Sequence, residues 1–257
     1  MVSATGVHCT AAHPPRRPPR AWQSAGVRPP EPDSPPPPDG GTLDAERFAA
    51  TLDLVVDADA RLAAVVDRFG RPGFWSRPPS FATLVLLVLE QQVSLASGKA
   101  TFDRLRALAG AVTPEAVAPL DLDALRGCGL TRQKAGYVAD LARGVLDGTV
   151  DWAAVITGDR DACRRALLGV RGIGPWTADV WLLACRGFPD EWPVGDRALQ
   201  VGCGEVVGAP GPLTGEALVD VARDWVPHRS TVARVVWHDY LARRRRAETV
   251  VEGLDGL

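Results

Sequence analysis

Apolar residues recur at helical spacing from residue 42 onward, and most of the apolar runs begin directly after a residue that caps helices. The predicted helices cover residues 57–69, 80–91, 94–108, 131–146, 159–168, 175–185, 196–207, 215–225 and 227–246. Pro114 and Pro175 stand at helix starts, where a proline gives up no hydrogen bond. No segment alternates apolar and polar residues over the length of a strand. The pattern therefore predicts an all-α fold.

Residues 1–41 lack this pattern and hold 11 of the 22 prolines. Such a segment buries too little apolar surface to offset the entropy lost on ordering. We therefore expect a disordered Pro-rich tail and a folded domain over residues 42–257. His8, Cys9 and His13 have metal-binding side chains, but on a disordered segment such residues are more often incidental than a metal site.

Composition and charge narrow the class of protein. The chain is 46% hydrophobic and 23% charged, which excludes a fibrous or wholly disordered protein. Its net charge of −2 means that any binding of nucleic acid must be local. The longest apolar stretch, residues 81–89, is too short to span a bilayer, and the N-terminus lacks the apolar core of a secretory signal. Five scattered cysteines favour free thiols, so we expect a cytoplasmic protein with no metal and no cofactor.

A tight turn, Gly172-Ile173-Gly174, joins the helix predicted at 159–168 to the helix that begins at Pro175. This is a helix-hairpin-helix arrangement. Free N–H groups of the turn and of the second helix, up to Thr177, would hold a phosphate oxygen without a cationic surface. A plain turn between helices, with glycines needed only for packing, is the alternative, and the glycine spacing alone favours it.

Asp196 starts the next predicted helix, 22 residues after Gly174. An aspartate at a helix start is most often an N-cap, and that role is compatible with a chemical one. The hairpin and this aspartate together resemble the helix-hairpin-helix DNA glycosylase superfamily, in which an aspartate at about this spacing is catalytic.

Three further segments resemble DNA-3-methyladenine glycosylase II in the same order. They are residues 90–94 (EQQVS), 129–137 (GLTRQKAGY) and 225–230 (WVPHRS), the last followed by Trp237. The resemblance covers residues 50–245 and implies a two-lobed fold, with a central lobe at 80–195 and a second lobe from 42–79 plus 196–247. It matches a compact form without the β-rich N-terminal domain of some members.

The resemblance also implies which chemistry to expect. Bifunctional relatives carry a nucleophilic lysine two residues after the last hairpin glycine, where this chain has Trp176, and no lysine follows Lys134. No cysteine follows Cys203, which excludes the C-terminal iron–sulfur cluster of some relatives. We therefore expect a monofunctional enzyme, in which water attacks the sugar.

A cationic alkylated base needs an electron-rich wall, and tryptophan supplies one. Trp176 is the first candidate for this base pocket and Trp225 the second, whereas Trp181, Trp192 and Trp237 are assigned to packing. Flipping leaves a gap in the duplex that a side chain must fill. The turn at residues 91–94 resembles the wedge loop of the family, which implies that Gln91 and Gln92 contact DNA and that Gln92 is the candidate plug. Ser94 as a simple N-cap is an alternative interpretation of that turn. Arg229 and Ser230 are candidates to orient the pocket or to contact DNA.

The resulting expectation is a monomer that removes alkylated purines from double-stranded DNA in base excision repair. One alternative keeps the enzyme class but changes the substrate to deaminated or oxidised bases, which would need an additional acid. The other is a non-catalytic protein that binds damaged DNA through the hairpin, against which the presence of Asp196 argues.

Overall fold

The computed structural model describes residues 41–244, and all regular secondary structure in that part of the chain is helical. The all-α prediction is confirmed, while the predicted tail lies almost wholly outside the described residues. The helices are α1 (Ala45–Ala58), α2 (Ala60–Phe69), α3 (Phe81–Glu90), α4 (Leu95–Ala109), α5 (Pro114–Val117), α6 (Leu122–Gly127), α7 (Arg132–Asp147), α8 (Trp152–Thr157), α9 (Arg160–Leu168), α10 (Pro175–Ala184), α11 (Arg197–Val206), α12 (Gly215–Val221), the 3-10 helix η2 (Ala222–Trp225) and α13 (Arg229–Arg243). No described helix is both long and apolar enough to cross a membrane.

Side-chain caps fix most of the helix starts. In α1 to α9 and in α11, an Asp, Ser or Thr precedes the helix and accepts a hydrogen bond from a backbone N–H of the first turn. The predicted helix at 57–69 is wrong in its start, because α1 continues to Ala58 and Asp59 is the residue that caps α2. The predicted helix at 215–225 tightens into η2 after Val221, and α13 begins at Arg229 rather than at 227.

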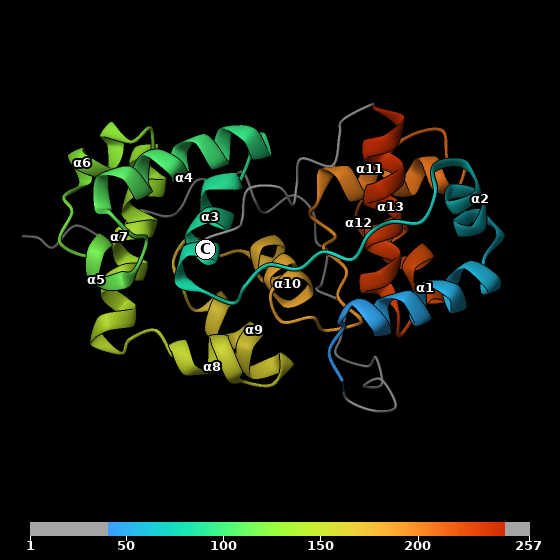
Figure 1. The fold of residues 1–257 in the computed structure, drawn as a ribbon, viewed down its shortest axis with the longest axis horizontal. Coiled ribbons are helices and arrows are strands. Elements are labelled where there is room, and N and C mark those ends of the chain that lie inside the picture. The colour runs from blue at the N-terminus through green and yellow to red at the C-terminus, as the bar shows by residue number, and fades with distance from the viewer. Residues whose placement is uncertain (1–40, 245–257) are drawn as a thin grey trace, which may run out of the picture.

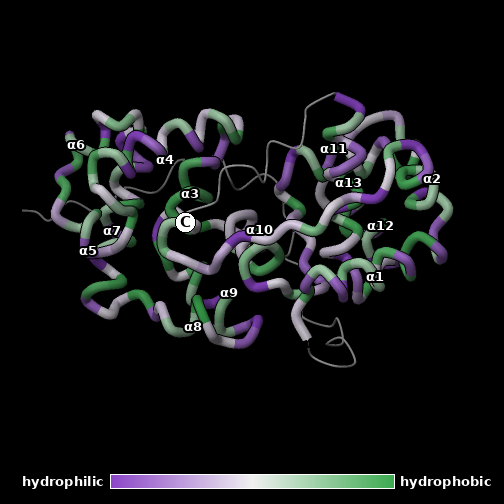
Figure 2. Tube along the Cα trace, viewed as in Figure 1, coloured by the Kyte–Doolittle hydropathy of each residue, from purple (hydrophilic) through white to green (hydrophobic). Residues whose placement is uncertain are grey.

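The helices form two groups that lie side by side in Figure 1. Helices α3 to α10 make up one group, in which α3 packs on α4, α7 and α10. Helices α1, α2 and α11 to α13 make up the other, in which α13 packs on α1, α2 and α11. Helix α3 is strongly apolar (Figure 2). Every position of α3 except Ala82 is buried. The lobe boundaries stated above stay a prediction.

A buried arginine of α13 joins the two groups of helices. Arg234 is 1% exposed and donates to the carbonyl oxygens of Trp75, Leu183 and Ser230 over 3.2, 3.2 and 3.0 Å. Burial without a facing carboxylate lowers the pKa of Arg234 to about 9. The guanidinium thus ties the segment before α3 and the end of α10 to α13.

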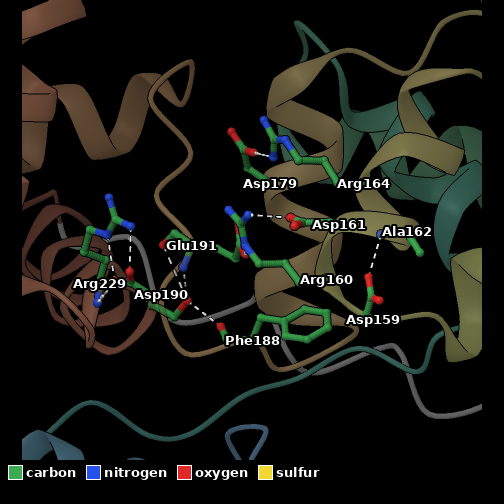
Figure 3. Close-up of polar contacts among 11 residues, drawn as sticks. Asp159, Arg160, Asp161, Ala162, Arg164, Asp179, Phe188, Asp190, Glu191 and Arg229 are labelled. Carbon is green, nitrogen blue, oxygen red and sulfur yellow. Dashed lines mark hydrogen bonds and ion pairs between the residues drawn. The ribbon is translucent and has the colours of Figure 1, made fainter. Parts of the chain in front are cut away.

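The segment between α10 and α11 is anchored to both groups by two adjacent carboxylates (Figure 3). Glu191 accepts from Nε of Arg160 on α9 over 2.5 Å, and Asp190 accepts from Nη2 of Arg229 on α13 over 2.6 Å. Glu191 is 2% exposed, so Arg160 neutralises a carboxylate that water does not reach. Since this segment leads directly into Asp196, these ion pairs help to set where that residue lies.

Candidate active site

The turn between α9 and α10 requires glycine at position 172. Gly172 has a φ of +91°, and a Cβ on it would lie 2.3 Å from the ring of Tyr137. Ile173 is 6% exposed and fixes the turn to the core. Arg164 of α9 forms an ion pair with Asp179 of α10, which holds the two helices of the hairpin together (Figure 3). Burial raises the pKa of Asp179 to about 6, although Arg164 opposes the shift.

Helix α10 begins without a side-chain cap. Its N-cap is Gly174, which makes no side-chain hydrogen bond, and its first residue is Pro175. The N–H groups of the first helical turn have no acceptor within the helix, so those of α10 are left for an outside acceptor. An oxygen of a phosphate suits this position because the helix dipole adds a partial positive charge there.

Two of the residues predicted to contact DNA have their side chains engaged inside the protein. Nε2 of Gln91 donates to the carbonyl oxygen of Gly172 over 2.9 Å and to Oγ1 of Thr177 over 3.0 Å. Thr177 is 1% exposed, so its side chain is not placed to contact DNA. Gln91 therefore holds the hairpin against the turn that follows α3.

The next residue, Gln92, is exposed and has a φ of +60°, the only positive value among the described residues other than glycine. A glutamine in this conformation is strained, and such strain is found at functional sites more often than elsewhere. Val93 beside it is 46% exposed. Ser94 does cap α4, accepting from the N–H of Ser97 over 3.2 Å, so the cap and the exposed glutamine occur in the same turn.

Three hydrogen bonds converge on the carboxylate of Asp196. Its Oδ1 accepts from the N–H of Leu199 over 2.8 Å, which makes it the N-cap of α11. The indole N–H of Trp176 donates to Oδ2 over 2.9 Å, and the indole N–H of Trp237 donates to Oδ1 over 3.0 Å. Trp176 comes from α10 and Trp237 from α13, so one tryptophan from each group of helices holds the carboxylate. Asp196 and both indoles remain partly exposed.

The sequence interpretation of Trp237 as a packing residue misses this contact. Trp237 also lies beside Trp75, with ring centroids 5.7 Å apart. No local signal in the sequence could have found the contact, because Trp237 is 41 residues from Asp196 and follows an ordinary helical pattern. Only the packing of α13 brings the two together.

The prediction that Trp225 lines the base pocket is wrong. Trp225 is 4% exposed, its ring packs on Trp192 at 5.6 Å, and its indole N–H donates to Oδ2 of Asp59 over 2.8 Å. Hydrogen bonds from Arg61, more than the one from Trp225, lower the pKa of Asp59 to about 2. Trp225 therefore belongs to the core between η2 and α2.

Ser230 is 0% exposed, so its side chain is not placed to contact DNA. Its Oγ donates to the carbonyl oxygen of Phe188 over 2.7 Å and accepts from the N–H of Glu191 over 2.9 Å. The side chain of Arg229 is 12% exposed and pairs with Asp190 (Figure 3). Both residues thus secure the segment that leads to Asp196, which is a structural task.

Within the described residues, no group of three or more His, Cys, Asp or Glu side chains is placed to hold a metal ion.

The ammonium of Lys134, the last lysine in the sequence, donates to the carbonyl oxygens of Leu89 and Gln91, over 2.7 Å in both cases. Cys128, Cys163, Cys185 and Cys203 are free.

Residues 85–225 match the model of the HhH-GPD superfamily base excision DNA repair proteins. A putative DNA-3-methyladenine glycosylase of Bacillus subtilis is 27% identical over 48% of this chain and 43% of its own length. Endonuclease III of Sulfolobus acidocaldarius is 34% identical over 42% of this chain and 50% of its own length. The chain thus spans about half the length, or less, of these two relatives.

Among solved structures, a DNA-3-methyladenine glycosidase from Bacillus halodurans has the same fold. It aligns with a TM-score of 0.64 and 24% identity, over 80% of this chain and 94% of its own. The family model covers more than half of the chain and includes the hairpin and Asp196. The protein therefore belongs to the HhH-GPD superfamily of base excision DNA repair proteins.

Proposed function

We propose that this protein is a monofunctional DNA glycosylase that removes alkylated purines, such as 3-methyladenine and 7-methylguanine, from double-stranded DNA. The observation that carries the proposal is the carboxylate of Asp196, which is held by the indoles of Trp176 and Trp237 and follows Gly174 of the uncapped hairpin by 22 residues. The similarity to relatives named as 3-methyladenine glycosylases supports this choice of substrate.

In the proposed mechanism, the N–H groups at the start of α10 bind a backbone phosphate, and the damaged nucleotide rotates out of the duplex. Gln92 enters the gap that this nucleotide leaves. The turn that holds Gln92 is fastened to the hairpin through Gln91, so the phosphate contact and the plug act on one stretch of DNA.

The chemical step is substitution at C1′ of the sugar. The bond between C1′ and the base nitrogen breaks, its electron pair passes to the cationic base, and the base leaves as a neutral molecule. Positive charge that develops on the sugar is stabilised by the carboxylate of Asp196. Water then adds at C1′ and gives up a proton. The indole of Trp176 offers an electron-rich face to the cationic base before it leaves.

The proposed enzyme has no lyase step. The position that a nucleophilic lysine would occupy is Trp176, and Lys134 is engaged with the carbonyl oxygens of Leu89 and Gln91. Borohydride should therefore trap no covalent adduct with DNA, and the abasic strand should stay uncut. A trapped adduct would show that an amine of the protein attacks the sugar.

We further propose that the protein acts as a monomer on DNA in the cytoplasm. Its four free cysteines in the described part of the chain, three of them buried, support a reducing compartment. Sedimentation at micromolar concentration tests the oligomeric state.

The substrate class is tested by incubating the protein with duplexes that contain alkylated, deaminated or oxidised bases and separating the released bases by chromatography. Release of 3-methyladenine and 7-methylguanine, with no release of uracil or 8-oxoguanine, is the expected result. Release of uracil or 8-oxoguanine alone would favour the glycosylase for neutral bases. Binding without release of any base would favour the non-catalytic reading.

A further inference from the structure

Two side chains, those of Lys134 and Gln91, fix the turn between α3 and α4 by hydrogen bonds to or from residues distant in sequence. Lys134 lies on α7, and its ammonium donates to the carbonyl oxygens of Leu89 and Gln91 at the end of α3. The last carbonyl oxygens of a helix have no N–H donor within the helix, so the ammonium of Lys134 supplies the donor at the end of α3. The ammonium is partly buried, and burial lowers the pKa of Lys134.

The second side chain is that of Gln91 itself. While its carbonyl oxygen is held by Lys134, its Nε2 donates to the hairpin, at Gly172 and Thr177. The backbone of Gln91 is therefore held by Lys134 of α7, and its side chain is held by the hairpin. The residue that follows it is Gln92, which is exposed and has a φ of +60°.

A glutamine in the left-handed region needs support from its surroundings, because the conformation is unfavourable for a side chain with a Cβ. The hydrogen bonds that hold the backbone and the side chain of Gln91 supply that support on the N-terminal side of Gln92. The N–H of Val93 closes the turn on the other side by donating to the carbonyl oxygen of Glu90 over 3.4 Å. Gln92 is thus the one residue of the turn that is strained, exposed and anchored through its neighbours.

We infer that Lys134 and Gln91 are positioning residues that join the hairpin and the Gln92 turn into one unit, so that phosphate binding at α10 sets how Gln92 enters the base stack. The inference rests on the proposed function, in which the hairpin binds phosphate and Gln92 is the plug. Neither Lys134 nor Gln91 touches the reacting atoms. Their removal should impair the opening of the duplex far more than the affinity for its backbone.

The test uses the full chain and a duplex with a stable abasic-site analogue opposite 2-aminopurine, whose fluorescence rises when it is unstacked. Wild type should raise the fluorescence at saturation. The variant Gln92→Gly, which removes the plug and suits a positive φ, should lose that rise and defines the zero level. Lys134→Met should lose most of the rise while Kd changes less than about threefold, because the hairpin keeps its phosphate contacts.

Matched variants separate positioning from general stability. Lys99→Met removes the only other lysine, which is exposed and pairs with Asp103 on the same helix, and it should behave as wild type. Lys134→Arg keeps a cation with several donors and should restore part of the rise. Gln91→Leu leaves the lysine in place but removes the donor to the hairpin, and it should lose the rise as well, which keeps the test informative if Lys134→Met folds poorly.

Each outcome decides the inference. A full rise with both Lys134→Met and Gln91→Leu overturns it, and so does a loss of affinity in proportion to the loss of fluorescence. If wild type produces no rise, the plug is absent and the inference fails, whatever the enzyme releases. If wild type produces the rise but releases no base, the proposed function fails while the positioning role stands.

Discussion

The indole of Trp237 donates its N–H to Oδ1 of Asp196 over 3.0 Å, from a helix that begins 33 residues after the carboxylate. Trp176, which precedes Asp196 by 20 residues, donates its indole N–H to Oδ2 over 2.9 Å. A carboxylate that accepts fixed hydrogen bonds on both oxygens cannot rotate freely, so it keeps its orientation before a substrate arrives.

Replacing Trp237 tests the importance of this fixed orientation. Trp237→Phe keeps most of the ring but removes the donor to Asp196, and we expect the rate of base release to fall by about tenfold, corresponding to ~1.4 kcal/mol for one hydrogen bond to a charged group. Trp225→Phe is the matched control, because it also removes an indole donor to an aspartate, here Asp59. It should lower the melting temperature and leave the rate per folded molecule unchanged. Equal loss of activity in both variants would contradict the assignment.

Trp176 is expected to serve both the carboxylate and the base. Trp176→Ala should lose at least ~1 kcal/mol of transition-state stabilisation toward 7-methylguanine, the usual value of a cation–π or stacking contact. Trp176→Phe should recover part of the loss, because a smaller aromatic face remains. Rate per folded molecule and melting temperature are measured together. A variant that melts much lower but cleaves normally at low temperature would assign Trp176 to packing.

The hairpin glycine offers a test of the phosphate site. Gly172→Ala would place a methyl group 2.3 Å from the ring of Tyr137, so we expect a lower melting temperature and weaker binding of DNA. Gly148→Ala is a close control, because Gly148 also has a positive φ, of +77°, but has no atom within 4 Å of the added carbon. It should cost about 1 kcal/mol of stability and leave DNA binding unchanged. Unaltered binding by Gly172→Ala would place the phosphate contact elsewhere.

The ion pair and hydrogen bonds of Asp59 predict a dependence of stability on pH. Its pKa is lowered from 3.8 to about 2, mainly by the hydrogen bonds from Arg61. A carboxyl group with a lowered pKa stabilises the folded state above its unfolded pKa, and that contribution disappears as the pH falls from about 4 to 2. The melting temperature of wild type should exceed that of Asp59→Asn at pH 7, and the difference should shrink between pH 4 and pH 2. A difference that is constant over that range would contradict the assigned pKa.

Much of the fold could be predicted from the sequence because helix starts are local. Ser80, Ser94 and Asp159 each precede a segment with apolar residues at helical spacing, and each does cap the helix that follows. The predicted start at Asp57 is wrong because two aspartates, Asp57 and Asp59, lie two positions apart, and only Asp59 has its backbone outside a helix.

The candidate site could be predicted only where its chemistry depends on neighbours in sequence. The glycine turn and the N-cap role of Asp196 are of this kind. The roles of Trp225, Ser230 and Trp237 depend on which residues pack against them from distant parts of the chain. Helical spacing in the sequence is the same whether such a side chain lies in the core or faces the site, so it could not tell these roles apart.

The most direct test of the central claim is single-turnover release of 7-methylguanine from a duplex by wild type and by Asp196→Asn. Asparagine still caps α11 through its oxygen, so the fold should persist, but it carries no charge to stabilise the sugar cation. We predict that release falls by about 100-fold or more while affinity for an abasic-site duplex stays close to that of wild type. Loss of binding and release together, or release at the rate of wild type, would contradict the assignment of Asp196 as the catalytic carboxylate.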